Sequence, residues 1–129
     1  MRIVLAAAVS ALVAMATQSA FAGDAAAGGK VFAQCRACHQ IGPGAKNLVG
    51  PQLNATIGRK AGSIEGFAYS EQHKASNIVW DKDTLSIYLR DPKALIPNNK
   101  MVFPGLKTDQ QIDDVIAFLL QYDAEGKTK

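Results

Sequence analysis

Two cysteines and a histidine lie close together in the first third of this 129-residue chain. Cys35 and Cys38 are separated by two residues, and His39 follows directly. This spacing is typical of the attachment of a c-type haem. On one turn of helix, two thiols so placed reach the two vinyl groups of one porphyrin, and the histidine projects toward its iron. The motif therefore predicts one covalently bound haem c.

Two other chemistries use cysteines at this spacing. A thioredoxin-like redox pair needs a parallel βαβ setting, and the sequence shows no alternation of strands with helices. A structural zinc site needs four ligands, and the only histidine besides His39 is His73, far along the chain. We therefore favour haem attachment over both alternatives.

The first residues are organised like a secretory signal peptide. Arg2 supplies a positive charge, residues 3–15 are almost purely apolar, and residues 20–22 (Ala-Phe-Ala) form a small-residue cleavage site. The sequence therefore predicts a signal peptide over residues 1–22, a mature domain over residues 23–129 and a location in the periplasm. The alternative is an uncleaved membrane anchor, because the apolar segment nearly reaches the roughly 20 residues that span a bilayer.

Charge and cysteine content exclude some functions. The chain carries 14 Lys and Arg against 11 Asp and Glu. Loss of Arg2 with the leader leaves 13 basic and 11 acidic side chains, a formal charge of +2. This mildly basic balance does not indicate nucleic-acid binding. Both cysteines belong to the motif, so we expect no structural disulfide.

Helical patterns flank the motif on both sides. Asp24 is placed to cap a helix that runs up to the cysteines, and the glycines at positions 28 and 29 within it suggest a close helix contact. Another helix begins at residues 81–84 and must end at residues 91–92 (Asp-Pro), because the residue before a proline disfavours helix.

The last helix has the clearest pattern. Thr108 and Gln111 are spaced as a capping box, and Gly126 marks the far limit of the helical segment. Its apolar stripe consists of Ile112, Val115, Ile116, Leu119 and Leu120. Residues 126–129 look disordered. The loops at residues 42–62 and 92–105 are rich in Gly, Pro and Asn. Ordered loops of that length usually enclose another group, which here is the predicted haem. We expect an all-α fold of several helices and long ordered loops around one haem.

Met101 is the only methionine outside the predicted leader. By default, such a methionine fills a gap in a core. At this point the chain resembles class I cytochrome c, the soluble bacterial and mitochondrial type, over essentially the whole mature length. The landmarks that carry the resemblance are, in order, Cys35-x-x-Cys38-His39, Gly50-Pro51-x-Leu53, Gly58-Arg59-Lys60-x-Gly62, Gly66-Phe67-x-Tyr69, Trp80, Tyr88-Leu89, Pro92 and Lys100-Met101-x-Phe103.

The resemblance implies a cytochrome c fold and assigns roles around the haem. His39 and Met101 are implied as the axial iron ligands, and the Pro51 carbonyl as the acceptor of the other ring hydrogen of His39. Cys35 and Cys38 are implied as the covalent links. The further haem-contacting residues implied are Arg59, Tyr69 and Trp80 at the propionates, Tyr88 near the methionine sulfur and Phe103 over the haem edge.

Two positions depart from the family pattern. Asn98-Asn99 replaces the usual Gly-Thr, so Asn98 must adopt a positive φ. His73 stands where the family often has an asparagine beside the buried propionate region. We interpret His73 first as a partly exposed histidine on a helix surface. The other hypothesis is that His73 titrates and makes the midpoint potential depend on pH.

Two axial ligands leave the iron without an open position, so the resemblance implies a single-electron carrier and not an enzyme. The alternative is a haem-based gas sensor or peroxidase, in which Met101 leaves the iron. The implied partners are membrane or periplasmic redox proteins, with a quinol-oxidising cytochrome bc complex as donor and a terminal oxidase or photosynthetic reaction centre as acceptor. We expect a monomer that binds no nucleic acid. Its expected docking residues are Lys46, Lys93, Lys100 and Lys107.

Overall fold

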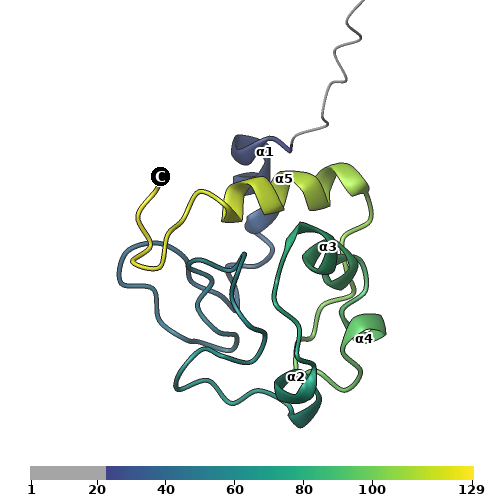
Figure 1. Cartoon of the computed structure of the whole chain (residues 1–129). Helices are drawn as coiled ribbons and strands as arrows, with labels where there is room; N and C mark the ends of the chain where they lie inside the picture. The colour runs from purple at the N-terminus through teal and green to yellow at the C-terminus, as the bar shows by residue number, and fades with distance from the viewer. Residues whose placement is uncertain (1–22) are drawn as a thin grey trace, which may run out of the picture.

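A computed structural model describes residues 23–129, and the predicted signal peptide at residues 1–22 lies outside the described residues. The helices of the described part are α1 (Ala25–Phe32), α2 (Glu71–Ala75), α3 (Lys82–Arg90), α4 (Pro92–Leu95) and α5 (Asp109–Leu119) (Figure 1). Between residues 23 and 129 no strands pair into a sheet, and only two isolated β-bridges form. The all-α prediction is therefore confirmed. None of these helices is long and apolar enough to cross a membrane.

Helices α1 and α5 cross in close contact at one end of the molecule (Figure 1). At the crossing, a Cβ on Gly28 would lie 1.9 Å from the carbonyl oxygen of Asp114, so only glycine lets the two backbones approach this closely. The rings of Phe32 and Phe118 pack beside this contact, with centroids 5.0 Å apart. The close helix contact predicted from the glycine pair is confirmed at Gly28.

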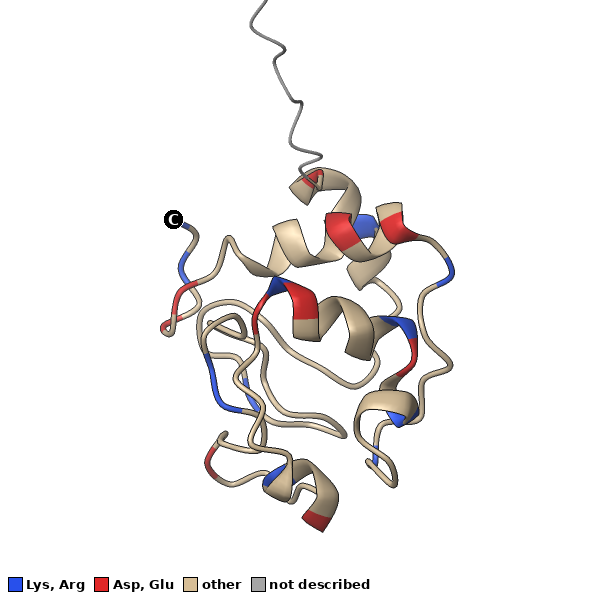
Figure 2. Cartoon of the chain, turned by 45° about the vertical axis from the view of Figure 1, so that its right-hand side comes forward, with Lys and Arg blue, Asp and Glu red and all other residues tan. Residues whose placement is uncertain are grey.

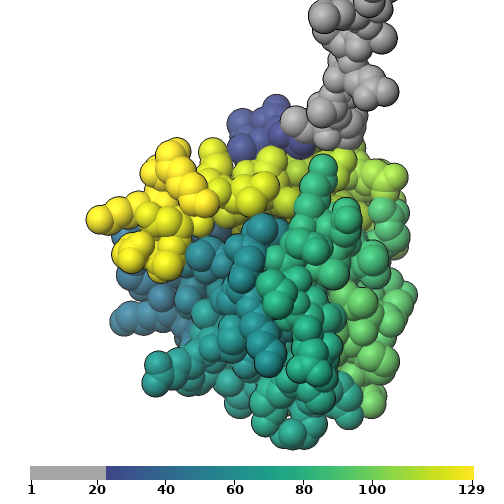
Figure 3. Space-filling model, viewed as in Figure 1, coloured from purple at the N-terminus to yellow at the C-terminus, as the bar shows by residue number. Residues whose placement is uncertain are grey.

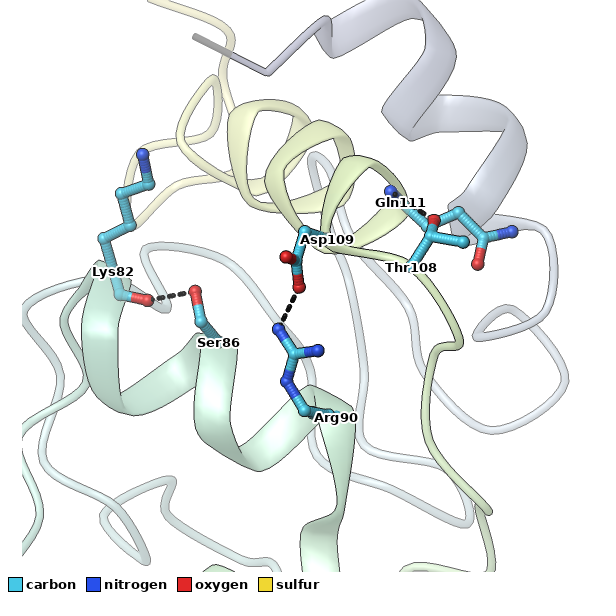
Figure 4. Close-up of polar contacts among 6 residues, drawn as sticks. All are labelled: Lys82, Ser86, Arg90, Thr108, Asp109 and Gln111. Atoms are coloured by element: carbon cyan, nitrogen blue, oxygen red, sulfur yellow. Dashed lines mark hydrogen bonds and ion pairs between the residues drawn. The ribbon is translucent and has the colours of Figure 1, made fainter. Parts of the chain in front are cut away.

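Polar caps hold the helix starts. The Asp24 carboxylate accepts hydrogen bonds from the backbone nitrogens of residues 26 and 27, which starts α1. Thr108 Oγ1 accepts from the backbone nitrogen of Gln111 at 3.2 Å, which starts α5 (Figure 4). A full reciprocal capping box forms instead at α3, between Asp81 and Thr84.

Helix α3 packs against α5 and presents Leu85 and Tyr88 to the interior. An exposed ion pair joins Arg90 at the end of α3 to Asp109 at the start of α5 (Figure 4). An exposed pair of this kind contributes at most about 1 kcal/mol. The helix ends at Arg90, directly before Asp91-Pro92 as predicted. The orientation of α3 thus depends chiefly on its buried apolar face.

The apolar stripe of α5 forms much of the core. Ile112, Val115, Ile116 and Leu119 are each at most 5% exposed. Leu120 was predicted to share this stripe, but it follows the end of the helix and is 44% exposed. The buried stripe therefore runs from Ile112 to the end of the helix at Leu119, and α5 packs with it against α1 and α3.

The C-terminal segment is ordered, so the expectation of disorder for residues 126–129 is wrong. The backbone nitrogen of Asp123 donates to the Lys127 carbonyl at 2.9 Å, and that of Lys129 donates to the Gln121 carbonyl at 2.8 Å. Gly126 is buried against the backbone of Gly42, where a Cβ would lie 2.1 Å from the carbonyl carbon. Figure 3 shows this yellow segment lying against the blue segment that follows the cysteine motif.

Candidate functional site

The structure brings all ten site residues named from the sequence to the wall of one cavity. The cysteine motif follows α1, Tyr88 lies on α3, and Met101 lies in the loop before α5. The complete set in the wall is Cys35, Cys38, His39, Pro51, Arg59, Tyr69, Trp80, Tyr88, Met101 and Phe103. Residues spread over most of the described chain therefore face one shared space.

The cysteine motif lies on helical turns that continue α1. The backbone nitrogen of His39 donates to the Cys35 carbonyl at 2.9 Å, which closes one turn around the motif. Burial, and then the proximity of Cys38, raises the pKa of the Cys35 thiol to about 11. A thiol with so high a pKa is a poor source of the thiolate that redox exchange needs.

Neither alternative use of the cysteines fits the fold. Residues 23–129 contain no parallel βαβ unit to support a thioredoxin-like pair. The same residues contain no group of three or more His, Cys, Asp or Glu side chains placed to hold a metal ion. Neither setting is therefore present in the described part of the chain.

The imidazole of His39 is held in one orientation. Its Nδ1 donates a hydrogen bond to the Pro51 carbonyl oxygen at 2.7 Å, which assigns the ring proton to Nδ1 and leaves Nε2 with a free lone pair. Burial lowers the pKa of His39, which favours the neutral ring. On the other side, a Cβ on Gly50 would lie 2.4 Å from Cε1 of the ring. A neutral, fixed imidazole of this kind is suited to binding iron.

Met101 is positioned by the two asparagines before it. The Asn99 side chain is buried, donates to the Ile96 carbonyl at 2.7 Å and accepts from the backbone nitrogen of Met101 at 2.9 Å. Asn98 has a φ of 57°, which confirms the positive φ predicted for it. The sequence analysis did not assign Asn99 its bond to Met101, although asparagine side chains commonly bond the backbone two residues further on.

Tyr88 contacts the methionine sulfur. Its hydroxyl donates to Met101 Sδ at 3.8 Å, a distance typical of weak bonds to sulfur. Burial raises the pKa of Tyr88 to about 12, so the phenol remains a donor at any physiological pH. The two side chains thus form one unit in the cavity wall.

Arg59 brings a positive charge into the same wall. Its guanidinium donates to the carbonyl oxygens of Gln52 at 3.2 Å and Asn54 at 3.0 Å. Burial lowers the pKa of Arg59, and no carboxylate between residues 23 and 129 forms an ion pair with it. A half-buried cation without an anionic partner fits a ligand that carries carboxylates, as haem does through its propionates.

The remaining wall is largely aromatic. Tyr69, Trp80 and Tyr88 are buried, and the Tyr69 hydroxyl accepts from the backbone nitrogen of Ile64 at 3.2 Å. His73 packs among these rings, with centroid distances of 4.9 Å to Tyr69 and 6.2 Å to Tyr88. Our first interpretation is therefore confirmed in part, because His73 lies on α2 and is only partly buried, but its ring also lines the cavity.

Several apolar wall residues carried no functional signal in the sequence. Leu85, Val115 and Leu119 lie on the apolar faces of α3 and α5, which helical spacing identifies only as buried. Spacing cannot tell a face that meets another helix from a face that meets a cofactor. These residues give the cavity a largely apolar wall, which suits the apolar faces of a porphyrin.

Exposed apolar side chains lie at the cavity mouth. Val102 is 99% exposed and Val49 is 77% exposed, and both belong to the cavity lining. Lys100 lies in the same lining and donates through Nζ to the Ala68 carbonyl at 2.9 Å. We call Val49, Val102 and the adjacent Leu48, which is 48% exposed, the apolar rim.

The other three lysines expected to dock partners lie outside the cavity wall. Lys46, Lys93 and Lys107 are exposed, and only Lys100 of the four reaches the lining. Figure 2 shows acidic segments on α5 and at the start of α3, with basic segments in the loops around them. Of the four lysines, Lys100 alone is therefore placed at the cavity by the described structure.

Comparison with known proteins agrees with this arrangement. The family model described as Cytochrome c matches residues 25–123. The chain belongs to the cytochrome c family. It is 51% identical over 118 residues to cytochrome c2 of Blastochloris viridis, a match that covers 92% of this chain and 93% of that protein. It is 48% identical over 107 residues to cytochrome c-550 of Nitrobacter winogradskyi, with 83% and 98% covered.

Solved structures show the same fold. Cytochrome cH from Methylobacterium extorquens superposes with a TM-score of 0.71 at 46% identity, over 76% of this chain and 98% of that one. This cytochrome c carries one covalent haem c through Cys35 and Cys38. It is an electron carrier similar to cytochrome c2, and it is not an enzyme. The fold and the cofactor predicted from the sequence are therefore confirmed.

Proposed function

We propose that this cytochrome c carries single electrons through a haem iron whose axial ligands are His39 and Met101. The bound haem supplies the one-electron chemistry of its iron. The observation that carries the proposal is that a neutral imidazole, fixed by Pro51, and a thioether, fixed by Asn99 and Tyr88, line the same cavity. With both axial positions filled, no site remains where a substrate could bind.

The chain's own residues favour the reduced state. The thioether of Met101 donates weakly to a ferric ion, and the Tyr88 hydroxyl weakens that donation further by engaging the sulfur. The apolar wall penalises an additional positive charge, and the Arg59 guanidinium adds to this penalty. We therefore expect a positive midpoint potential, in the range used by respiratory electron carriers.

Other wall residues hold the haem at its two ends. Arg59, Tyr69 and Trp80 supply a guanidinium, a phenol and an indole that donate to the propionates. Phe103 covers the exposed haem edge. The support for these roles is that all four side chains line the cavity and that Arg59 has no carboxylate partner within residues 23–129. Such donors offset the cost of burying propionate charge.

Carbon monoxide binding tests the axial ligation. The reduced wild-type protein should bind carbon monoxide poorly near neutral pH, because Met101 occupies the position that the gas needs. Met101→Ala should bind it readily, and Val102→Ala, at the exposed neighbouring position, should behave like wild type. Rapid binding by the wild type would contradict the carrier and favour the gas sensor or peroxidase.

We propose that partners dock over the cavity mouth. A quinol-oxidising cytochrome bc complex is the proposed donor, and a terminal oxidase or photosynthetic reaction centre is the proposed acceptor. The apolar rim supplies close contact, and Lys46, Lys93, Lys100 and Lys107 attract acidic surfaces. Complexes for electron transfer tend to be small and short-lived.

The proposed location is the periplasm, reached after removal of residues 1–22 as a signal peptide. A monomer of residues 23–129 is the proposed active form. The protein purified from the periplasm should have an N-terminal sequence that begins at Gly23. Gel filtration should give the molecular mass of a single protomer. A sequence that begins at Met1 would instead favour the uncleaved anchor.

A further inference from the structure

Asn54 is a buried polar residue that the sequence analysis did not single out and that the proposed function does not use. It is 6% exposed. Its Oδ1 accepts a hydrogen bond from the Gly42 backbone nitrogen at 2.8 Å, and its Nδ2 donates to the Gly42 carbonyl at 2.9 Å. One side-chain amide thus satisfies both backbone polar groups of one residue, as a paired β-strand would. We call these two bonds the Asn54 clamp.

Gly42 is itself held in place. It is buried, and it follows His39 by three residues. The C-terminal turn packs directly on it, since a Cβ on Gly126 would lie 2.1 Å from both the carbonyl carbon and the carbonyl oxygen of Gly42. Beside the clamp, the Leu53 backbone nitrogen donates to the Gln40 carbonyl at 2.9 Å. The clamp therefore fastens its own turn to the segment that directly follows the proposed iron ligand.

The turn that contains Asn54 also holds the guanidinium of Arg59. Arg59 Nη1 donates to the carbonyl oxygens of Gln52 at 3.2 Å and of Asn54 itself at 3.0 Å. The Asn54 backbone nitrogen donates to Gln52 Oε1 at 2.7 Å, so the two residues form one unit. Both acceptors of the guanidinium within residues 23–129 thus belong to the clamped turn. The place of the positive charge in the cavity wall depends on where that turn lies.

The backbone of this turn is strained. Ala55 directly follows Asn54 and has a φ of 49°, a left-handed conformation that is unfavourable for any residue with a Cβ. Strain of this kind persists only where surrounding contacts determine the conformation. The adjacent contacts are the Asn54 clamp and the bond from Thr56 Oγ1 to the Leu53 carbonyl at 2.7 Å. Without the clamp the turn should relax, and the two carbonyls that hold Arg59 should move with it.

We propose that Asn54 is a positioning residue for electron transfer, because its clamp fixes the Arg59 guanidinium at the cavity wall and thereby raises the midpoint potential. The inference rests on the proposed function, in which Arg59 faces the bound haem. A fixed cation beside the cavity penalises the ferric state, which carries one more positive charge than the ferrous state. When the clamp is lost, the guanidinium can turn toward water, and the ferric state becomes more favourable.

Redox titration of the holoprotein tests this proposal. With an effective dielectric constant of about 20, moving a unit charge from about 8 Å to about 10 Å from the iron changes the ratio of reduced to oxidised protein about twofold. Asn54→Leu, which keeps the approximate shape and removes both bonds to Gly42, should therefore lower that ratio about twofold at a fixed applied potential. Asn54→Ser should act in the same direction and disturbs the packing of the turn differently.

Two further proteins show whether the effect passes through Arg59. In Arg59→Gln, which has no guanidinium to position, adding Asn54→Leu should leave the potential unchanged. Gln40→Ala is the matched control, because it removes a 2.8 Å side-chain bond to the Lys46 backbone nitrogen in the segment that holds Gly42. Its potential should equal that of the wild type, since the Gln40 side chain has no bond to the turn that holds Arg59.

The wild-type holoprotein supplies a test that needs no variant. Hydrogen exchange followed by NMR in low concentrations of denaturant reports which groups open together. We expect the Gly42 amide proton and the Arg59 guanidinium protons to share one opening equilibrium once their intrinsic exchange rates are taken into account. Free exchange of the guanidinium protons while the Gly42 amide stays protected would overturn the proposal, because the clamp would then be closed without holding Arg59.

The failure of this inference is distinguishable from the failure of the proposed function. A wild-type potential in folded Asn54→Leu, or an equal shift in the Arg59→Gln background, would overturn the positioning role alone. An unchanged potential in Arg59→Gln itself would overturn the proposed role of Arg59 and this inference with it. The axial ligation is judged separately, by whether the reduced wild type refuses carbon monoxide.

Discussion

At the scale of single residues, the Tyr88 hydroxyl should tune the iron through Met101. Tyr88→Phe removes the 3.8 Å bond to the sulfur, so the thioether donates more strongly to ferric iron and the midpoint potential should fall. A weak hydrogen bond of about 0.5–1 kcal/mol corresponds to about 20–40 mV for one electron. Redox titration measures the change. A potential equal to or above that of wild type would show that the hydroxyl does not act on the sulfur.

Gly50 controls the orientation of His39 at the same scale. In Gly50→Ala the new Cβ meets the imidazole at 2.4 Å, so the ring must move away from its 2.7 Å bond to Pro51. We expect a loss of about 1–3 kcal/mol in the free energy of unfolding, the range for overpacked sites. Chemical denaturation of the holoprotein measures this loss. Val49→Ala alters the exposed neighbour and should change stability by less than about 0.5 kcal/mol.

At the scale of elements, the α1 and α5 crossing depends on one of two adjacent glycines. In Gly28→Ala the Cβ would lie 1.9 Å from a backbone oxygen of α5, so the helices must separate, at a cost of about 3 kcal/mol. In Gly29→Ala the nearest contact is an ordinary 3.5 Å to the Phe118 ring, and helix propensity favours alanine by up to about 1 kcal/mol.

Thermal and chemical unfolding of the two variants should therefore change in opposite directions. Gly29→Ala serves as the matched control, because it makes the same chemical change one residue away. Equal gains in both variants would mean that helix propensity, and not the crossing, limits stability. Arg90→Gln, which breaks the exposed bridge between α3 and α5, should cost less than about 1 kcal/mol.

At the scale of the whole molecule, the distribution of charge should govern the rate of encounter with partners. Lys93→Glu combined with Lys100→Glu should slow reduction by a cytochrome bc complex by about tenfold at low salt, and should weaken the dependence of the rate on salt. Lys127→Glu changes charge on the C-terminal turn and should have little effect. A salt dependence identical to that of wild type in the double variant would exclude the proposed docking face.

The chemistry of the site could be predicted because its main signals are local. Cys35, Cys38 and His39 are adjacent in sequence, so their covalent spacing alone predicts haem attachment. Asp24 and Thr108 start helices through bonds within three residues, and proline at position 92 ends α3 for a local steric reason. Resemblance to the family then assigned Met101 and the other wall residues, which the structure brings to one cavity.

The rest was decided by contacts between distant segments. Gly126 is ordered because it packs on Gly42, and a polar tail gives no local sign of such a partner. His73 faces the cavity because Tyr69, Trp80 and Tyr88 enclose its ring, and no local pattern in the sequence indicated these neighbours. Covalent spacing and short-range hydrogen bonds depend only on residues that are close in the sequence. Burial and charge environment exist only after the chain has folded, and they determine which side chains face the cavity.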